Sequence, residues 1–121
     1  MRLHPWMQMG SRLWMLAFWI TCATVTTLAL LPTAYLPPNL FNWWDKAQHA
    51  LAFAVLGGLG LGAYPRHVPR VLIGLVLMGG CIELVQAATG WRYGEWFDWL
   101  ADIVGVVLAG LLWRFLTRRS V

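Results

Sequence analysis

Residues 45–64 read DKAQHALAFAVLGGLGLGAY, and the polar start of this apolar stretch requires partners from the other helices. It opens with three ionisable side chains, Asp45, Lys46 and His49, and continues as an apolar run suited to lipid. A charged side chain at membrane depth costs on the order of 2.5 to 3.5 kcal/mol, so such groups need polar partners or water. We therefore expect other membrane segments of the chain to supply these partners.

The composition is that of an integral membrane protein. Hydrophobic residues make up 60% of the 121 residues and charged residues only 12%, and the mean hydropathy is +0.61. Four apolar segments, residues 13–31, 45–64, 70–88 and 98–116, approach the ~20 residues that a helix needs to cross a ~30 Å hydrocarbon layer. The chain is predicted to be a single all-α domain, residues 1–121, forming a four-helix transmembrane bundle.

Arginine residues fall in alternate connections between these segments, which accounts for the net charge of +4. Arg2 and Arg12 precede the first segment, and Arg66 and Arg70 lie at the connection between the second and the third. Three more lie at the end of the chain: Arg114, Arg118 and Arg119. Cytoplasmic loops of membrane proteins carry such an excess of basic residues. Both termini are therefore predicted to be cytoplasmic in a multi-pass protein, and nucleic acid is not expected as a partner.

Under this topology every acidic residue falls on the outer side of the membrane. The five acidic residues are Asp45, Glu83, Glu95, Asp98 and Asp102. Acidic residues contribute little to membrane orientation, so the rule that places the arginines does not explain this distribution. We expect the acids to belong to a polar site near the outer face.

Helical spacing places the polar residues of the third and fourth segments on shared faces. Glu83 and Gln86 are three residues apart, and Asp98 and Asp102 are four apart. Glu83 lies roughly 7 to 8 Å below the predicted end of its helix, a depth at which it should face a partner or water. The face of Asp98 and Asp102 continues through Gly105, so it is expected to point into the bundle.

Glycine residues in the second and third segments predict close contacts between helices. Gly58 and Gly62 are four apart and place two positions without side chains on one face, where helix backbones can approach. Gly74, Gly79 and Gly80 are further candidate packing points. The same glycine-rich faces could join two copies of the chain into a homodimer.

The polar residues are expected to converge in one outward-facing site. His49 and Glu83 are the candidate catalytic pair, with His49 as general acid or base oriented by Glu83 or Asp98. Lys46 and Arg92 are expected to hold an anion, aided by the positive N-terminal ends of the second and fourth helices. The candidate ligand-binding residues are Asp45, Lys46, Gln86, Arg92, Asp98 and Asp102.

The ordered set Asp45-Lys46-x-x-His49, Glu83-x-x-Gln86, Arg92 and Asp98-x-x-x-Asp102-x-x-Gly105 resembles the VanZ-like family of bacterial integral membrane proteins. The pattern covers residues 45–110, over half of the chain. The family is named for a protein associated with resistance to the glycopeptide antibiotic teicoplanin. The resemblance therefore implies a role in the cell envelope and a place in the bacterial inner membrane.

Two positions depart from the family pattern. Ala50 stands where an aromatic residue is common, and Phe53 can fill that space. Asp102 stands where asparagine is common and adds an acid to the site, so no family role is carried over to this residue.

Three functions stay open at this point. The leading interpretation is a site for the head group of an envelope lipid or lipid-linked glycan intermediate, linked to glycopeptide resistance, with membrane lipids as partners. The alternatives are a membrane-embedded enzyme acting on a lipid phosphate, and a structural polar staple that fixes helix register. No cofactor is expected. One histidine with three carboxylates could hold a cation, but no metal site is predicted, because no H-x-x-x-H or cysteine cluster accompanies the carboxylates.

Overall fold

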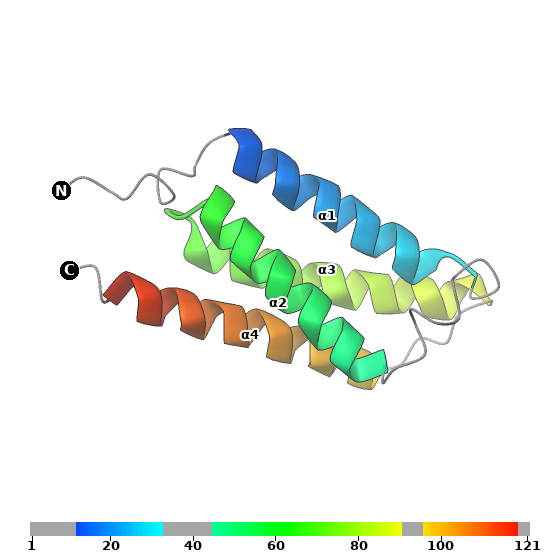
Figure 1. Cartoon of the computed structure of the whole chain (residues 1–121). Coiled ribbons are helices and arrows are strands. Elements are labelled where there is room, and N and C mark those ends of the chain that lie inside the picture. The colour runs from blue at the N-terminus through cyan, green and yellow to red at the C-terminus, as the bar shows by residue number, and fades with distance from the viewer. Residues whose placement is uncertain (1–11, 33–44, 91–95, 119–121) are drawn as a thin grey trace.

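The computed structural model describes residues 12–32, 45–90 and 96–118, and within these ranges the regular structure consists of four helices. They are α1 (Arg12–Leu30), α2 (Asp45–Ala63), α3 (Val68–Thr89) and α4 (Trp96–Arg118). Successive helices run in opposite directions, so α2 and α4 begin at the end of the bundle where α1 and α3 finish (Figure 1). The predicted all-α class is confirmed.

The helices lie close to the predicted segments, with shifts at their ends. α3 begins at Val68 because Pro69 occupies its first turn, where the missing N–H of proline is tolerated. It ends before Gly90, whose φ of 79° is a left-handed conformation that glycine adopts readily. α4 begins at Trp96, so Asp98 lies in its first turn, beside the positive end of the helix dipole.

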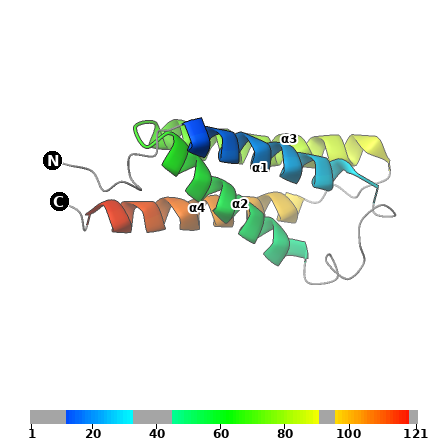
Figure 2. The ribbon, with the colours of Figure 1, turned by 45° about the horizontal axis from the view of Figure 1, so that its top comes forward.

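The centre of the bundle is the crossing of α2 and α4, which is its most extensive helix contact. Figure 2 shows α2 passing obliquely across α4. α3 packs against both α4 and α2, and α1 packs against α2 and α3. Glycine permits this close crossing. A Cβ atom on Gly105 would collide with the backbone carbonyl of Ala50, and one on Gly57 would lie 2.5 Å from the Cβ of Ala109.

Gly58 and Gly74 were predicted to lie at close contacts between helices, and this prediction is wrong for contacts within the described part of the chain. A Cβ added to either would meet no atom within 4 Å, whereas Gly62 lies against the indole of Trp14 in α1. The physical reason is that α2 has neighbours on several sides, so Gly57 and Gly62 approach different helices. The prediction of a homodimer through the glycine faces stays untested.

The outer surface of the bundle is apolar, and its mainly hydrophobic interior also encloses several polar side chains. Buried residues include four polar side chains, Glu83, Gln86, Asp98 and Asp102. Large apolar side chains are exposed along its outer faces, among them Leu13, Leu16, Ile20, Ile73, Leu77, Leu84, Leu111 and Phe115. Water-soluble proteins bury such groups and rarely enclose acids, so this distribution belongs to a surface solvated by lipid.

Three of the described helices, α1, α3 and α4, are long and apolar enough to cross a membrane. Together with the apolar outer surface, they identify the chain as a membrane protein. α2 is outside this set because it opens with Asp45, Lys46 and His49. A fourth span through α2 and cytoplasmic termini stay predictions.

Candidate functional site

Five ionisable side chains gather at the end of the bundle where α2 and α4 begin, and we call them the polar cluster: Lys46, His49, Glu83, Asp98 and Asp102. Helix geometry brings them together. Lys46 and His49 lie in the first two turns of α2, and both aspartates lie in the first two turns of α4. Glu83 comes from the last two turns of the antiparallel helix α3.

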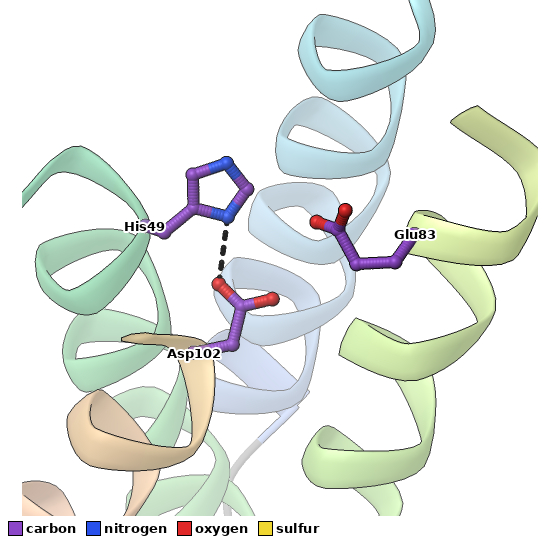
Figure 3. A group of neighbouring side chains, drawn as sticks. All are labelled: His49, Glu83 and Asp102. Atoms are coloured by element: carbon purple, nitrogen blue, oxygen red, sulfur yellow. Dashed lines mark hydrogen bonds and ion pairs between the residues drawn. The ribbon is translucent and has the colours of Figure 1, made fainter. Parts of the chain in front are cut away.

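The shortest contact in the polar cluster joins His49 to Asp102. The Nδ1 atom of His49 lies 2.8 Å from Oδ1 of Asp102 (Figure 3), a distance typical of a strong charge-assisted hydrogen bond. With Asp102 as a carboxylate, Nδ1 donates the proton and the imidazole is held in one orientation. The sequence predicted Glu83 or Asp98 as the orienting acid, and the structure places Asp102 nearest instead.

Asp98 connects the imidazole to the only lysine of the chain. The Nε2 atom of His49 lies 3.8 Å from Oδ2 of Asp98, and the Nζ atom of Lys46 lies 3.7 Å from Oδ1 of Asp98. The Lys46 side chain is 35% exposed, those of Asp98 and His49 are 13% and 18% exposed, and that of Asp102 is 0% exposed. The polar cluster therefore leads from the edge of the bundle into its interior.

Glu83 approaches the His49–Asp102 pair from α3. It is 7% exposed and belongs to the buried stripe of this helix, which includes Ile82 and Gln86. Figure 3 shows its carboxyl group directed toward the space between His49 and Asp102. One donor atom from each of these three residues lies within 4.8 Å of the other two. These three residues could hold a metal ion.

Gly79 and Trp99 hold Asp102 in place, and the sequence interpretation gave neither a role in the site. A Cβ on Gly79 would lie 2.9 Å from Oδ2 of Asp102, so glycine is needed for the aspartate to fit against α3. The indole Nε1 of Trp99 donates to the carbonyl of Val76 at 2.9 Å, which ties α4 to α3. The sequence could have indicated Trp99 by its spacing, because Trp99 and Asp102 are three residues apart and share a helix face.

Gln86 is buried as predicted, but its amide serves helix packing. Its Nε2 donates to the carbonyl oxygen of Ala29 at 2.8 Å. Ala29 lies in the last turn of α1, where carbonyl groups have no intrahelical donor. The predicted ligand-binding role of Gln86 is untested, and the contact that the structure shows joins α1 to α3.

Two further predicted site residues cannot be placed. Arg92 lies outside the described residues. Asp45 begins α2, but its side chain is outside the described part of the chain. The predicted anion contact of Arg92 and the predicted ligand contact of Asp45 therefore stay predictions.

The described polar cluster holds more acidic than basic groups. Glu83, Asp98 and Asp102 face Lys46 and His49, and Lys46 lies beside Asp98. Like-charged carboxylates in a medium of low polarity repel one another, so the arrangement favours a shared proton or a bound cation. A phosphate group would contact Lys46 at the exposed edge of the polar cluster, whereas a cation would contact Glu83 and Asp102 in the interior.

Two grooves on the described part of the bundle contain no residue of the polar cluster. One, of about 480 Å³, lies between α2 and α4 and includes Gly58 and Leu112. The other, of about 500 Å³, lies between α1 and α3 and includes Trp19 and Gly74. Both are apolar and open to the outer surface, where lipid chains would fill them.

Comparison with known proteins adds no family to this geometry. No protein-family model, curated protein or solved structure matches the chain. The resemblance to the VanZ-like family thus rests on the residue pattern described above, and the structure establishes a membrane protein with a buried cluster of ionisable side chains.

Proposed function

We propose that this chain is a bacterial cell-envelope protein whose polar cluster binds the head group of an envelope lipid or of a lipid-linked glycan intermediate. The observation that carries the proposal is the series Lys46, Asp98, His49 and Asp102, which runs from an accessible edge into a bundle with an apolar surface. Contacts between polar groups within membranes average only ~0.6 kcal/mol. Helix packing alone is therefore a weak reason to bury this many ionisable groups.

The depth of the polar cluster suits a lipid head group. Its residues occupy the terminal two turns of α2, α3 and α4. Two helical turns correspond to about 11 Å, so in a membrane-spanning bundle the polar cluster lies near the boundary of head groups and acyl chains. The N-termini of α2 and α4 add positive dipole ends there, and Lys46 adds a cation for a phosphate.

The distribution of arginines supports an extracytoplasmic position for the polar cluster. Arg66 and Arg70 lie in and just after the turn that joins α2 to α3, and Arg114 and Arg118 lie near the end of α4. All four are at the end of the bundle opposite the polar cluster. The positive-inside rule then directs the polar cluster to the outer face of the inner membrane.

Mass spectrometry of co-purifying lipids tests the proposal. The full chain is expressed in a bacterial host and purified in mild detergent, alongside Lys46→Ala, His49→Ala and the control Arg66→Ala at the opposite end. Wild type and the control are expected to retain one lipid class above its membrane abundance, and the two polar-cluster variants to lose it at least ten-fold. Identical lipid profiles in all four proteins, with circular dichroism showing equal helix content, would refute head-group binding.

The His49–Asp102 contact favours a second candidate, a membrane-embedded enzyme that acts on a lipid phosphate. A histidine oriented by an acid through Nδ1 has its Nε2 available for proton transfer, which is the arrangement of a general base. Turnover of defined phospholipids and polyprenyl phosphates by the purified protein distinguishes the two. An enzyme would release phosphate or an altered lipid and lose at least 100-fold in rate with His49→Gln, whereas a binding protein would return the lipid unchanged.

The resemblance to the VanZ-like family supports testing a link to glycopeptide resistance. Expression of the wild-type chain in a susceptible Gram-positive host is expected to raise the inhibitory concentration of teicoplanin. His49→Ala at equal membrane abundance is expected to abolish the increase. Equal susceptibility with and without the wild-type chain would contradict the link.

A further inference from the structure

We propose that His49, Glu83 and Asp102 form a binding site for one divalent metal ion of the zinc class. Donor atoms of the three side chains lie within 4.8 Å of one another. Zinc binds nitrogen and carboxylate oxygen at about 2.0 to 2.2 Å, so ligands of one ion lie roughly 3 to 3.5 Å apart. Binding of the ion would draw the three side chains together toward the shared centre.

Asp102 provides an independent indication of a ligand. Its side chain is fully buried, and one oxygen, Oδ1, faces His49. The other oxygen, Oδ2, is buried and has no hydrogen-bond partner among residues 12–32, 45–90 and 96–118. Figure 3 shows it on the side of Asp102 that faces Glu83. A buried carboxylate oxygen without a donor is costly, and coordination to a cation would satisfy it.

The imidazole of His49 lies between two carboxylates. Its Nδ1 faces Asp102, and its Nε2 lies 3.8 Å from the carboxylate of Asp98. Metal-ligating histidines commonly donate their other ring N–H to a carboxylate, which fixes the ring and strengthens the ligand. With the ion on Nδ1, a small approach of Asp98 would let it accept from Nε2 and act as a positioning residue.

Charge balance also favours a divalent ion. The carboxylates of Glu83 and Asp102 together carry two negative charges when ionised, and Asp98 lies beside Lys46. Among the described side chains of the polar cluster, a doubly charged cation would offset these two charges. Neutrality matters here because the surrounding surface is apolar and isolated charges in such surroundings are unfavourable.

The donor set determines the kind of metal. One imidazole and two carboxylates suit zinc and its first-row neighbours, whereas magnesium and calcium prefer sites made of oxygen alone. Three protein ligands also leave a coordination position for water or another oxygen ligand, as in catalytic zinc sites. The inference does not depend on head-group binding, because it requires only the three side chains.

Calorimetric titration of the full chain with zinc chloride tests the site directly. The protein is purified in detergent without a histidine tag, freed of lipid and treated with chelator. Wild type is expected to bind one zinc ion per chain with micromolar or tighter affinity, and magnesium at least 100-fold more weakly. Absence of zinc binding by wild type at 1 mM would overturn the proposal.

Substitutions separate this site from adventitious binding. Glu83→Gln and Asp102→Asn each keep the shape of the side chain and are expected to weaken zinc binding at least 100-fold. Asp98→Asn is expected to weaken it by about 10 to 100-fold, the usual effect of losing a carboxylate behind a ligating histidine. Arg66→Ala, at the opposite end of the bundle, is expected to bind as wild type does. Equal affinity in all variants would place zinc elsewhere and overturn the assignment.

X-ray absorption of the zinc-loaded wild type keeps the test decisive if a variant does not fold. The expected spectrum shows one imidazole and several oxygen neighbours at about 2.0 to 2.2 Å. A sulfur neighbour would implicate the cysteines, and two or more imidazoles would implicate other histidines. Either result would overturn the site proposed here, whatever the lipid measurements give.

Discussion

The close crossing of α2 and α4 can be tested by adding one methyl group at Gly105. Its Cβ would collide with the carbonyl oxygen of Ala50 and would lie 2.9 Å from the backbone nitrogen of Ala54. Both contacts are with backbone, so no side chain can rotate away. The second distance would have to widen from 2.9 Å to the 3.4 Å or more of ordinary contact, which requires α2 to move away from α4.

This movement has an expected energetic cost. Overpacking a well-packed interior costs about 1 to 3 kcal/mol. Replacing glycine by alanine also favours the helix by up to about 1 kcal/mol, which partly masks that cost. Gly58→Ala is the matched control, because Gly58 is in α2 and its added Cβ meets nothing within 4 Å. The difference between the two variants isolates the steric effect, and we expect Gly105→Ala to be less stable by about 1 to 3 kcal/mol.

Reversible unfolding in mixed micelles, followed by circular dichroism, measures this difference. The movement also affects the polar cluster, since Ala50 follows His49 and Gly105 is one turn beyond Asp102. We therefore expect Gly105→Ala to weaken zinc binding as well, and Gly58→Ala to leave it unchanged. Equal unfolding free energies and equal zinc affinities in the two variants would refute the described crossing.

Three further predictions follow from individual contacts. Gly79→Ala is expected to displace the carboxylate of Asp102 and to weaken zinc binding by about 10 to 100-fold. Gly74→Ala adds a methyl group in open space and is expected to leave zinc binding unchanged, and calorimetric titration of both variants measures the difference. Gln86→Leu removes the hydrogen-bond donor to the carbonyl of Ala29 and is expected to lower the unfolding free energy by about 1 kcal/mol in mixed micelles. An unchanged unfolding transition would contradict this prediction. Fluorescent-protein and alkaline-phosphatase fusions at the C-terminus are expected to report a cytoplasmic position, and an active phosphatase fusion would reverse the predicted topology.

The sequence was most informative where helical periodicity alone decides the outcome. Glu83 and Gln86 were predicted to share a face, as were Asp98 and Asp102, and all four are buried in the structure. Segment length and hydropathy predicted a membrane protein, and three of the described helices are long and apolar enough to cross a membrane. These features depend on residues close together in one helix, so they can be recognised without knowing how the helices pack.

Features that depend on packing between helices were harder to predict. Glycine spacing could not show that Gly57 rather than Gly58 meets α4, because the direction of each face depends on the crossing of α2. The same crossing decides that His49 meets Asp102 most closely. The possible metal ligands His49, Glu83 and Asp102 come from three helices, so they form no local motif, and the sequence interpretation did not predict a metal site.

Nuclear magnetic resonance of the metal-free protein can show whether His49, Glu83 and Asp102 meet inside the bundle. With histidine, aspartate and glutamate isotopically labelled, we expect a strongly downfield proton on Nδ1 of His49, with correlations to the carboxyl groups of both Asp102 and Glu83. The downfield proton should disappear in Asp102→Leu and persist in Arg66→Ala. A His49 ring that correlates with neither carboxyl group would show that the three side chains do not meet.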